Sequence, residues 1–180
     1  MFLDTFSRPR FLAISAAVGC LAFTLSGCSG EEPKREYSTP SSLCGTKIEA
    51  NLLEEFLPAG EKLTVRGRRV GPDTTHCDVR VDSKTILVTT QTWWESGSTV
   101  ARFAMGQTLD DPDKSSGAGS YLYSGYQAFG KVTDCVNPDH EDQELYTGLQ
   151  ATGSKHRDAD SMLQMIKSYT KDVRGSQQCQ

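Results

Sequence analysis

The sequence predicts an α+β fold: a single antiparallel β-sheet of about six strands, with the N- and C-terminal helices packed on one face. Three observations lead to this prediction. Apolar residues recur at helical spacing in residues 46–56 and again in residues 158–174. Between these two segments, residues 62–152 are mostly β-branched or alternating stretches separated by polar turns. Strands that follow one another through short turns pair antiparallel.

The first helix is expected within residues 46–56. Thr46 and Glu49 have the spacing of a capping box, in which each side chain satisfies a free backbone donor at the helix start. The apolar residues at helical spacing are Ile48, Leu52, Leu53 and Phe56. Pro58 and Gly60 are expected to end the segment.

The middle of the chain is expected to hold the strands. The predicted strands span residues 62–70, 77–82, 86–94, 99–107, 121–136 and 144–152. The clearest pattern is CDVRVD, in which Cys77, Val79 and Val81 face one way and the polar residues face the other. Residues 108–120 are polar and rich in glycine and serine, so they are expected to form a long loop.

The last helix has the most regular pattern. Its apolar stripe consists of Met162, Met165, Ile166, Tyr169 and Val173. Asp158 and Asp160 lie at its start, and Lys171 and Arg174 lie near its end, an order that the helix dipole favours. Gly175 is a natural stop after the last turn.

Residues 1–27 predict a lipoprotein signal peptide. Arg8 and Arg10 precede the uncharged run FLAISAAVGCLAFTL. At about 15 residues this run is short for a transmembrane helix, which needs roughly 20. The next residues, LSGC, resemble a bacterial lipobox, and this resemblance implies cleavage before Cys28 and a diacylglycerol on its sulfur. A transmembrane anchor and a conventional signal peptide are the two alternatives.

The predicted signal peptide implies a cellular location and a domain organisation. The mature chain would begin at Cys28 and be held by its lipid on the outer, extracytoplasmic face of the cell membrane. Residues 28–43 are small, charged or proline-rich, so they are expected to form a flexible tether. Residues 44–180 are expected to form one α+β domain.

Four cysteines remain in the predicted domain: Cys44, Cys77, Cys135 and Cys179. An even number in an exported domain predicts two disulfides. Three pairings are open from the sequence. We favour Cys44–Cys77 with Cys135–Cys179, because each bond would then join the outer end of a helix to a nearby strand.

Composition narrows the classes of ligand. The formal net charge is −4, and no basic face of the kind that binds nucleic acid is evident. No two cysteines have the close spacing of a structural zinc site, and the three histidines form no metal-binding motif. We therefore expect no metal, cofactor or nucleic acid.

The strongest candidates for ligand contact are Trp93 and Trp94. Neighbours on a strand face opposite sides, so one ring should enter the core while the other is exposed or lies under a helix. An exposed ring would suit an envelope protein or a glycan. A basic patch of Arg66, Arg68, Arg69 and Arg80 is a second surface hypothesis, and pairing with the plentiful carboxylates is its simpler interpretation.

No arrangement of catalytic residues is recognisable, so a binding or accessory module is the leading hypothesis. The alternative is a cell-envelope hydrolase whose site is assembled from distant residues. Its acid/base candidates would be Asp139, His140 and Glu141.

The pattern as a whole resembles small actinobacterial, streptomycete-type secreted lipoproteins of uncharacterised function. The resemblance lies in LSGC, in LCGTKIEANLLEEFLP, in CDVRVD, in KVTDCV and in the closing QQC. It implies an exported, disulfide-bonded domain tethered to a membrane, and it implies no catalytic residues.

Overall fold

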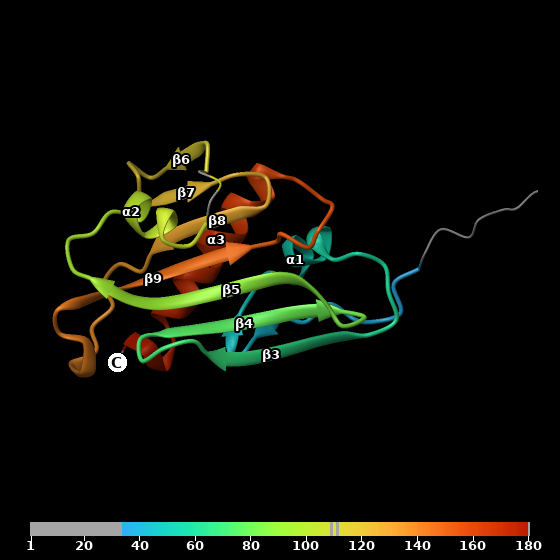
Figure 1. Ribbon diagram of the computed structural model, residues 1–180, viewed down its shortest axis with the longest axis horizontal. Coiled ribbons are helices and arrows are strands. Elements are labelled where there is room, and N and C mark those ends of the chain that lie inside the picture. The colour runs from blue at the N-terminus through green and yellow to red at the C-terminus, as the bar shows by residue number, and fades with distance from the viewer. Residues whose placement is uncertain (1–33, 109, 111, 180) are drawn as a thin grey trace, which may run out of the picture. The chain divides into compact units, whose positions relative to one another are not determined.

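A computed structural model describes residues 34–108, 110 and 112–179. Its core element is a seven-stranded antiparallel sheet in the order β3-β4-β5-β9-β8-β7-β6 (Figure 1). The strands are β3 (Leu63–Arg69), β4 (Thr74–Val81), β5 (Lys84–Glu95), β6 (Lys114–Ser116), β7 (Tyr121–Tyr123), β8 (Gln127–Lys131) and β9 (Gln143–Gln150). A separate hairpin pairs β1 (Ser42–Leu43) with β2 (Thr46–Lys47).

Three α-helices and two short 3-10 helices complete the described chain. They are α1 (Ala50–Phe56), α2 (Val100–Met105), α3 (Ala159–Arg174), η1 (Pro138–His140) and η2 (Gln177–Cys179). The predicted α+β class with an antiparallel sheet is therefore present. The predicted strand number is too low, because seven strands form the main sheet and two more form the hairpin.

Helix α3 covers one face of the sheet. Its apolar stripe of Met162, Met165, Ile166, Tyr169 and Val173 is fully buried. The helix contacts β7, β8 and β9, and it also contacts α1 and β2. Asp158 caps its start by accepting a hydrogen bond from the Ser161 backbone N–H, and it ends before Gly175, as the sequence pattern predicts.

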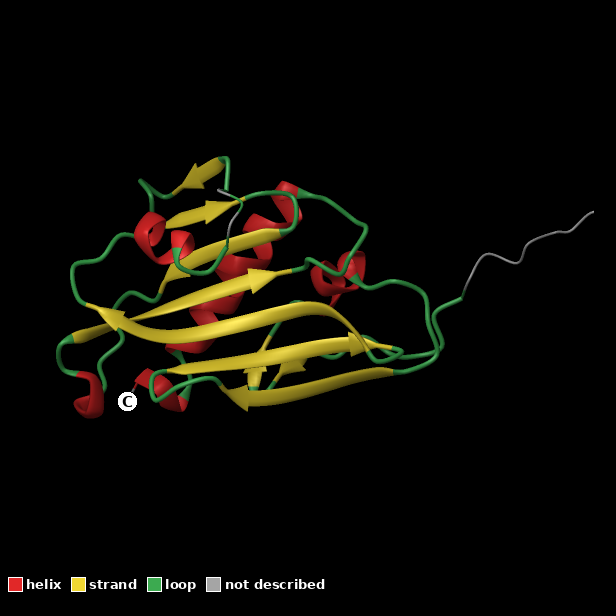
Figure 2. Ribbon diagram, in the orientation of Figure 1, coloured by secondary structure: helices red, strands yellow, loops and turns green. Residues whose placement is uncertain are grey.

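Helix α2 covers the opposite face and corrects a predicted strand (Figure 2). Phe103 of α2 packs with Phe129 and Tyr146, whereas the adjacent residues Ala128 and Leu145 belong to the core cluster under α3. Because neighbours on a strand face opposite sides, the two helices sandwich the sheet. The Thr99 side chain stabilises the start of this helix by accepting a hydrogen bond from the Arg102 N–H.

Two further differences from the prediction account for the other strands. Residues 121–136 contain two short strands, β7 and β8, rather than one. The predicted loop of residues 108–120 contains β6, whose sequence Lys-Ser-Ser pairs with β7 and with no other described strand at the sheet edge. Such a polar edge strand has no hydrophobic alternation by which a sequence pattern could reveal it.

The predicted capping box at the first helix is wrong. Thr46 lies in β2, is buried, and its Oγ1 accepts a hydrogen bond from Gln91 Nε2 at 3.0 Å. The helix starts only after Glu49, whose side chain makes no capping bond and instead accepts from Ser168 Oγ. The Thr46 hydroxyl that the capping box would use is bonded instead to Gln91, a residue distant in sequence.

The predicted tether is too long at its C-terminal end. Arg35 forms a bridge with Gly60, an ion pair with Glu54 and a hydrogen bond to the Leu57 carbonyl. Leu43 is fully buried. The Gly60 N–H also donates to the Lys34 carbonyl, so the chain is bound to the domain from Lys34 onward. The predicted signal peptide and Cys28 lie outside the described residues.

Candidate functional site

The main candidate site is a cavity of about 690 Å³ near the C-terminal end of α3. Its floor is the α3 side of β3, β4 and β5, and its walls are the β1–β2 hairpin and η2. The lining residues are Cys44, Gly45, Thr46, Gly67, Arg68, Arg69, Thr75, His76, Cys77, Thr89, Gln91, Tyr169, Gly175, Ser176, Gln177 and Gln178. A volume of this size is typical of sites for small ligands. We call it the α3 cavity.

A hydrogen-bonded network lines the inner side of the α3 cavity. The Tyr169 hydroxyl lies 2.9 Å from Gln91 Nε2 and 3.0 Å from Thr89 Oγ1. Gln91 Nε2 also donates to Thr46 Oγ1, so both amide hydrogens are used. Burial raises the pKa of the Tyr169 hydroxyl, which therefore stays neutral at physiological pH. The network fixes four polar side chains in one arrangement.

Two polar groups that line the α3 cavity have no partner within the described chain. No described residue donates a hydrogen bond to Gln91 Oε1, and none forms an ion pair with Arg69. Within the described chain, Asp and Glu are absent from the lining. The cavity thus offers an amide oxygen and a guanidinium, and its only charged side chains are basic.

Both walls of the α3 cavity are held by disulfides. The structure joins Cys44 to Cys77 and Cys135 to Cys179, which is the predicted pairing. The first bond ties the β1–β2 hairpin to β4, and the second ties η2 to the segment before η1. Asn137 Nδ2 adds a hydrogen bond to the Gln178 carbonyl. Two short elements of the cavity wall are therefore cross-linked to the rest of the domain.

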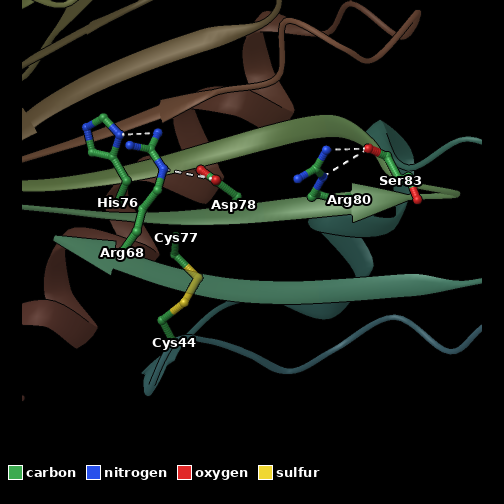
Figure 3. A network of polar contacts seen from close by, with 7 residues as sticks. All are labelled: Cys44, Arg68, His76, Cys77, Asp78, Arg80 and Ser83. Atoms are coloured by element: carbon green, nitrogen blue, oxygen red, sulfur yellow. Dashed lines mark hydrogen bonds and ion pairs between the residues drawn. A yellow bond between two sulfur atoms is a disulfide. The ribbon is translucent and has the colours of Figure 1, made fainter. Parts of the chain in front are cut away.

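A second polar cluster lies on the opposite, open face of β3 and β4 (Figure 3). Arg68 Nε donates to Asp78 Oδ2 at 3.0 Å, and Arg68 Nη2 lies 2.8 Å from His76 Nδ1. Because a guanidinium can only donate, Nδ1 of His76 must accept and carry no proton. Burial and the neighbouring Arg68 lower the pKa of His76, while Asp78 opposes them. Figure 3 also shows Arg80 bonded to the Ser83 carbonyl.

The His76 arrangement predicts a loss of stability in acid. Its pKa in the folded chain is lower than the ordinary 6.5, so the unfolded chain binds an extra proton as the pH falls through that value. The free energy of unfolding should therefore decrease below about pH 6.5. Urea denaturation of wild type and His76→Asn between pH 7.5 and 5 tests this, because asparagine keeps an acceptor for Arg68 but does not titrate. Equal pH slopes for the two proteins would contradict the prediction.

The two tryptophans do not line the α3 cavity. Trp93 is 5% exposed and stacks on His140, with ring centroids 4.4 Å apart. Its Nε1 is buried and has no hydrogen-bond partner in the described chain. Trp94 is half-buried and packs edge-on against Phe103 of α2. One ring thus enters the core and the other lies against a helix. A ligand role for either ring stays a prediction.

The three acid/base candidates of the hydrolase alternative are not brought into one site. His140 Nδ1 lies 2.6 Å from Gln143 Oε1 and 3.9 Å from an oxygen of Asp73. Asp139 and Glu141 are exposed and form no ion pair or side-chain hydrogen bond with His140 in the described chain. Among the described residues, no group of three or more His, Cys, Asp or Glu is placed to hold a metal ion. The hydrolase alternative stays a prediction.

The predicted basic patch is only partly paired. Arg68 bonds to Asp78, and Arg80 bonds to the Ser83 carbonyl. Arg66 and Arg69 form no ion pair with any described residue. Both unpaired guanidiniums belong to β3.

One feature of the sequence could have indicated the α3 cavity, namely polar residues on a strand face that is otherwise apolar. On the face of β5 that is turned to α3, Leu87 and Trp93 are buried apolar residues, but Thr89 and Gln91 between them are polar. Polar residues on a buried strand face need partners. Those partners, Thr46 and Tyr169, are too far away in sequence for a local pattern to identify.

Comparison with known proteins returns no relative. No protein-family model, no curated protein and no solved structure matches the chain. In the described part of the chain, no helix combines the length and the apolar character needed to cross a membrane.

Proposed function

We propose that this protein is an extracytoplasmic lipoprotein, anchored through a diacylglycerol on Cys28, that works as a binding module for an envelope partner or ligand. Residues 25–28 support the anchor, because they resemble a lipobox and follow a positive and then apolar N-terminal segment. The two disulfides support an oxidising compartment.

The α3 cavity is the observation that carries the binding role. Its volume of about 690 Å³ suits a small ligand or a few residues of a larger one. Its walls are cross-linked by two disulfides, and its inner polar groups are already ordered by hydrogen bonds. Little conformational freedom is then lost on binding, and such pre-organisation raises affinity.

The chemistry of the lining favours an anionic ligand with hydrogen-bonding groups. Arg69 is the lining cation without an ion pair in the described chain, although the protein as a whole carries a net charge of −4. A carboxylate or other oxyanion pairs well with a guanidinium through paired hydrogen bonds. Gln91 Oε1 would accept from a hydroxyl or amide of the same ligand.

Site-specific photo-crosslinking tests this function. A benzophenone amino acid replaces Gln177, an exposed residue of the cavity wall, in the full chain expressed in intact cells. We expect a crosslinked species of defined mass that is lost in the Arg69→Glu background. The matched control carries the same amino acid at Lys155, an exposed position that does not line the α3 cavity.

Two outcomes would count against the proposal. An identical set of crosslinks from positions 177 and 155 would show that the α3 cavity has no ligand of its own. Equal crosslinking by Cys28→Ala, with that variant recovered in the membrane fraction, would argue against the lipid anchor.

A further inference from the structure

One long edge of β3 has no neighbouring strand in the described chain. β3 is the first strand of the seven-stranded sheet, and among the described residues only β4 pairs with it (Figure 1). Its seven residues are in uninterrupted register with β4, from Leu63 opposite Val81 to Arg69 opposite Thr75. An unprotected strand of this kind is a template on which another extended chain can pair.

The hydrogen bonds at both ends of the β3–β4 pair show which backbone groups point outward. The Asp82 N–H donates to the Lys62 carbonyl, and the Val70 N–H donates to the Thr74 carbonyl. Bonded and non-bonded pairs alternate in an antiparallel ladder. The even-numbered residues of β3 therefore bond to β4. The backbone groups that face outward belong to Leu63, Val65, Gly67 and Arg69, and none of them has a partner in the described chain.

The side chains of β3 specify the charge of an added strand. Arg66, Arg68 and Arg69 make β3 basic, and it contains no acidic residue. Arg66 and Arg69 lack an ion pair in the described chain, and Arg68 is held by Asp78 on the open face. An incoming strand with alternating carboxylates would place them beside Arg66 and Arg68, because alternate residues share a face. Self-pairing of two β3 strands would instead oppose arginines to one another, which disfavours a second copy as occupant.

The edge and the α3 cavity share residues. Gly67 and Arg69 of the edge strand face the α3 side and also line the cavity, whereas the Arg68 side chain lies on the open face. Gly67 cannot carry a larger side chain without crowding, since a Cβ there would lie 3.3 Å from Cys44 Sγ. An extended chain on this edge would therefore direct alternate side chains toward the cavity mouth. Backbone pairing with pockets for alternate side chains is a common mode of peptide recognition.

We propose that the partner is an extended acidic peptide segment that adds as a strand to β3 and inserts a side chain into the α3 cavity. This inference rests on the proposed function, because it names the class of ligand for that cavity. It also makes the edge of β3, rather than the cavity alone, the source of affinity.

The probe is an end-capped synthetic peptide, long enough to span β3, in which glutamate alternates with valine except that the valine facing Arg69 is also replaced by glutamate. It is titrated into the full chain in detergent, and backbone amides are followed by NMR. We expect the amide hydrogens of Leu63, Val65, Gly67 and Arg69 to become protected from exchange. The same peptide with lysine in place of glutamate should bind about tenfold more weakly or worse, because like charges then face Arg66 and Arg68.

Two variants separate the edge from the cavity. Val65→Pro removes one outward N–H and leaves the bonds to β4 intact, so it should weaken the peptide about tenfold. Val65→Thr keeps the N–H and the branched shape, and it should bind normally. Thermal denaturation of both variants checks that they are folded.

The outcomes are distinguishable. No binding of the glutamate peptide, or equal binding by wild type and Val65→Pro, overturns the edge inference. Binding that is insensitive to Val65→Pro but lost in Gln91→Leu overturns it while leaving the proposed function intact. Edge protection together with no crosslink from position 177 supports the edge but overturns the proposed role of the cavity. If, in the absence of peptide, the protection of these amides increases with protein concentration, the occupant is a second copy of the chain and the inference is overturned.

Discussion

Replacing Cys44 and Cys77 together by alanine should lower the free energy of unfolding by about 4 kcal/mol. The bond closes a loop between positions 33 residues apart, so its removal restores much conformational freedom to the unfolded chain. It also frees the β1–β2 hairpin, which has only two residues in each strand. Urea denaturation of the full chain in detergent, followed by tryptophan fluorescence, measures the loss.

The second disulfide supplies the matched comparison. Replacing Cys135 and Cys179 by alanine should cost a similar amount, because its positions are 44 residues apart. Hydrogen exchange should distinguish the two variants, with faster exchange in β2 for the first and in η2 for the second. A loss below about 1 kcal/mol in the first variant would show that packing alone holds this wall of the α3 cavity.

Phe103→Ala should lower the free energy of unfolding by about 3–5 kcal/mol. The Phe103 side chain is fully buried, and its ring lies 5.0 to 6.0 Å from the rings of Tyr146, Trp94 and Phe129. Truncation would leave a void at the centre of the only cluster that fixes α2 to the sheet in the described chain. Thermal and urea denaturation of the full chain measure the effect.

Met105→Ala is the control that separates a helix from a strand at this place. In a strand, Phe103 and Met105 would share a face, and both substitutions would be costly. In helix α2, Met105 is 64% exposed, so its replacement should change stability by no more than about 0.5 kcal/mol. Comparable losses for the two variants would contradict the helix.

Strong periodicity made several elements predictable. Helix α3 follows directly from its apolar stripe, from Asp158 as cap and from Gly175 as stop. β4 follows from the alternation of Cys77, Val79 and Val81, all of which are buried. In these segments the local preference and the tertiary environment agree, so a pattern confined to a few residues is sufficient.

Short or weakly patterned elements were not predictable in the same way. Residues 100–105 contain enough apolar and β-branched residues to suit a strand. Val100, Phe103 and Ala104 are buried together because they pack against Phe129 and Tyr146, which are distant in sequence. Thr46 has a capping spacing, but Gln91 takes its hydroxyl from a strand 45 residues away. Such competition between local and distant partners lies outside any short window.

The sequence alone thus determines the class of the protein: the antiparallel α+β domain, the helix α3, and the inventory of four cysteines whose pairing it leaves open. The tertiary structure decides where those residues meet. It brings Thr46, Thr89, Gln91 and Tyr169 into one network, leaves Arg66 and Arg69 without an ion pair among the described residues, and places β3 at a sheet edge. The physical reason is the sequence separation of the residues in contact. Periodicity within a short segment shows which face of one element is buried. A binding site depends instead on contacts between elements far apart in sequence, and only packing brings those elements together.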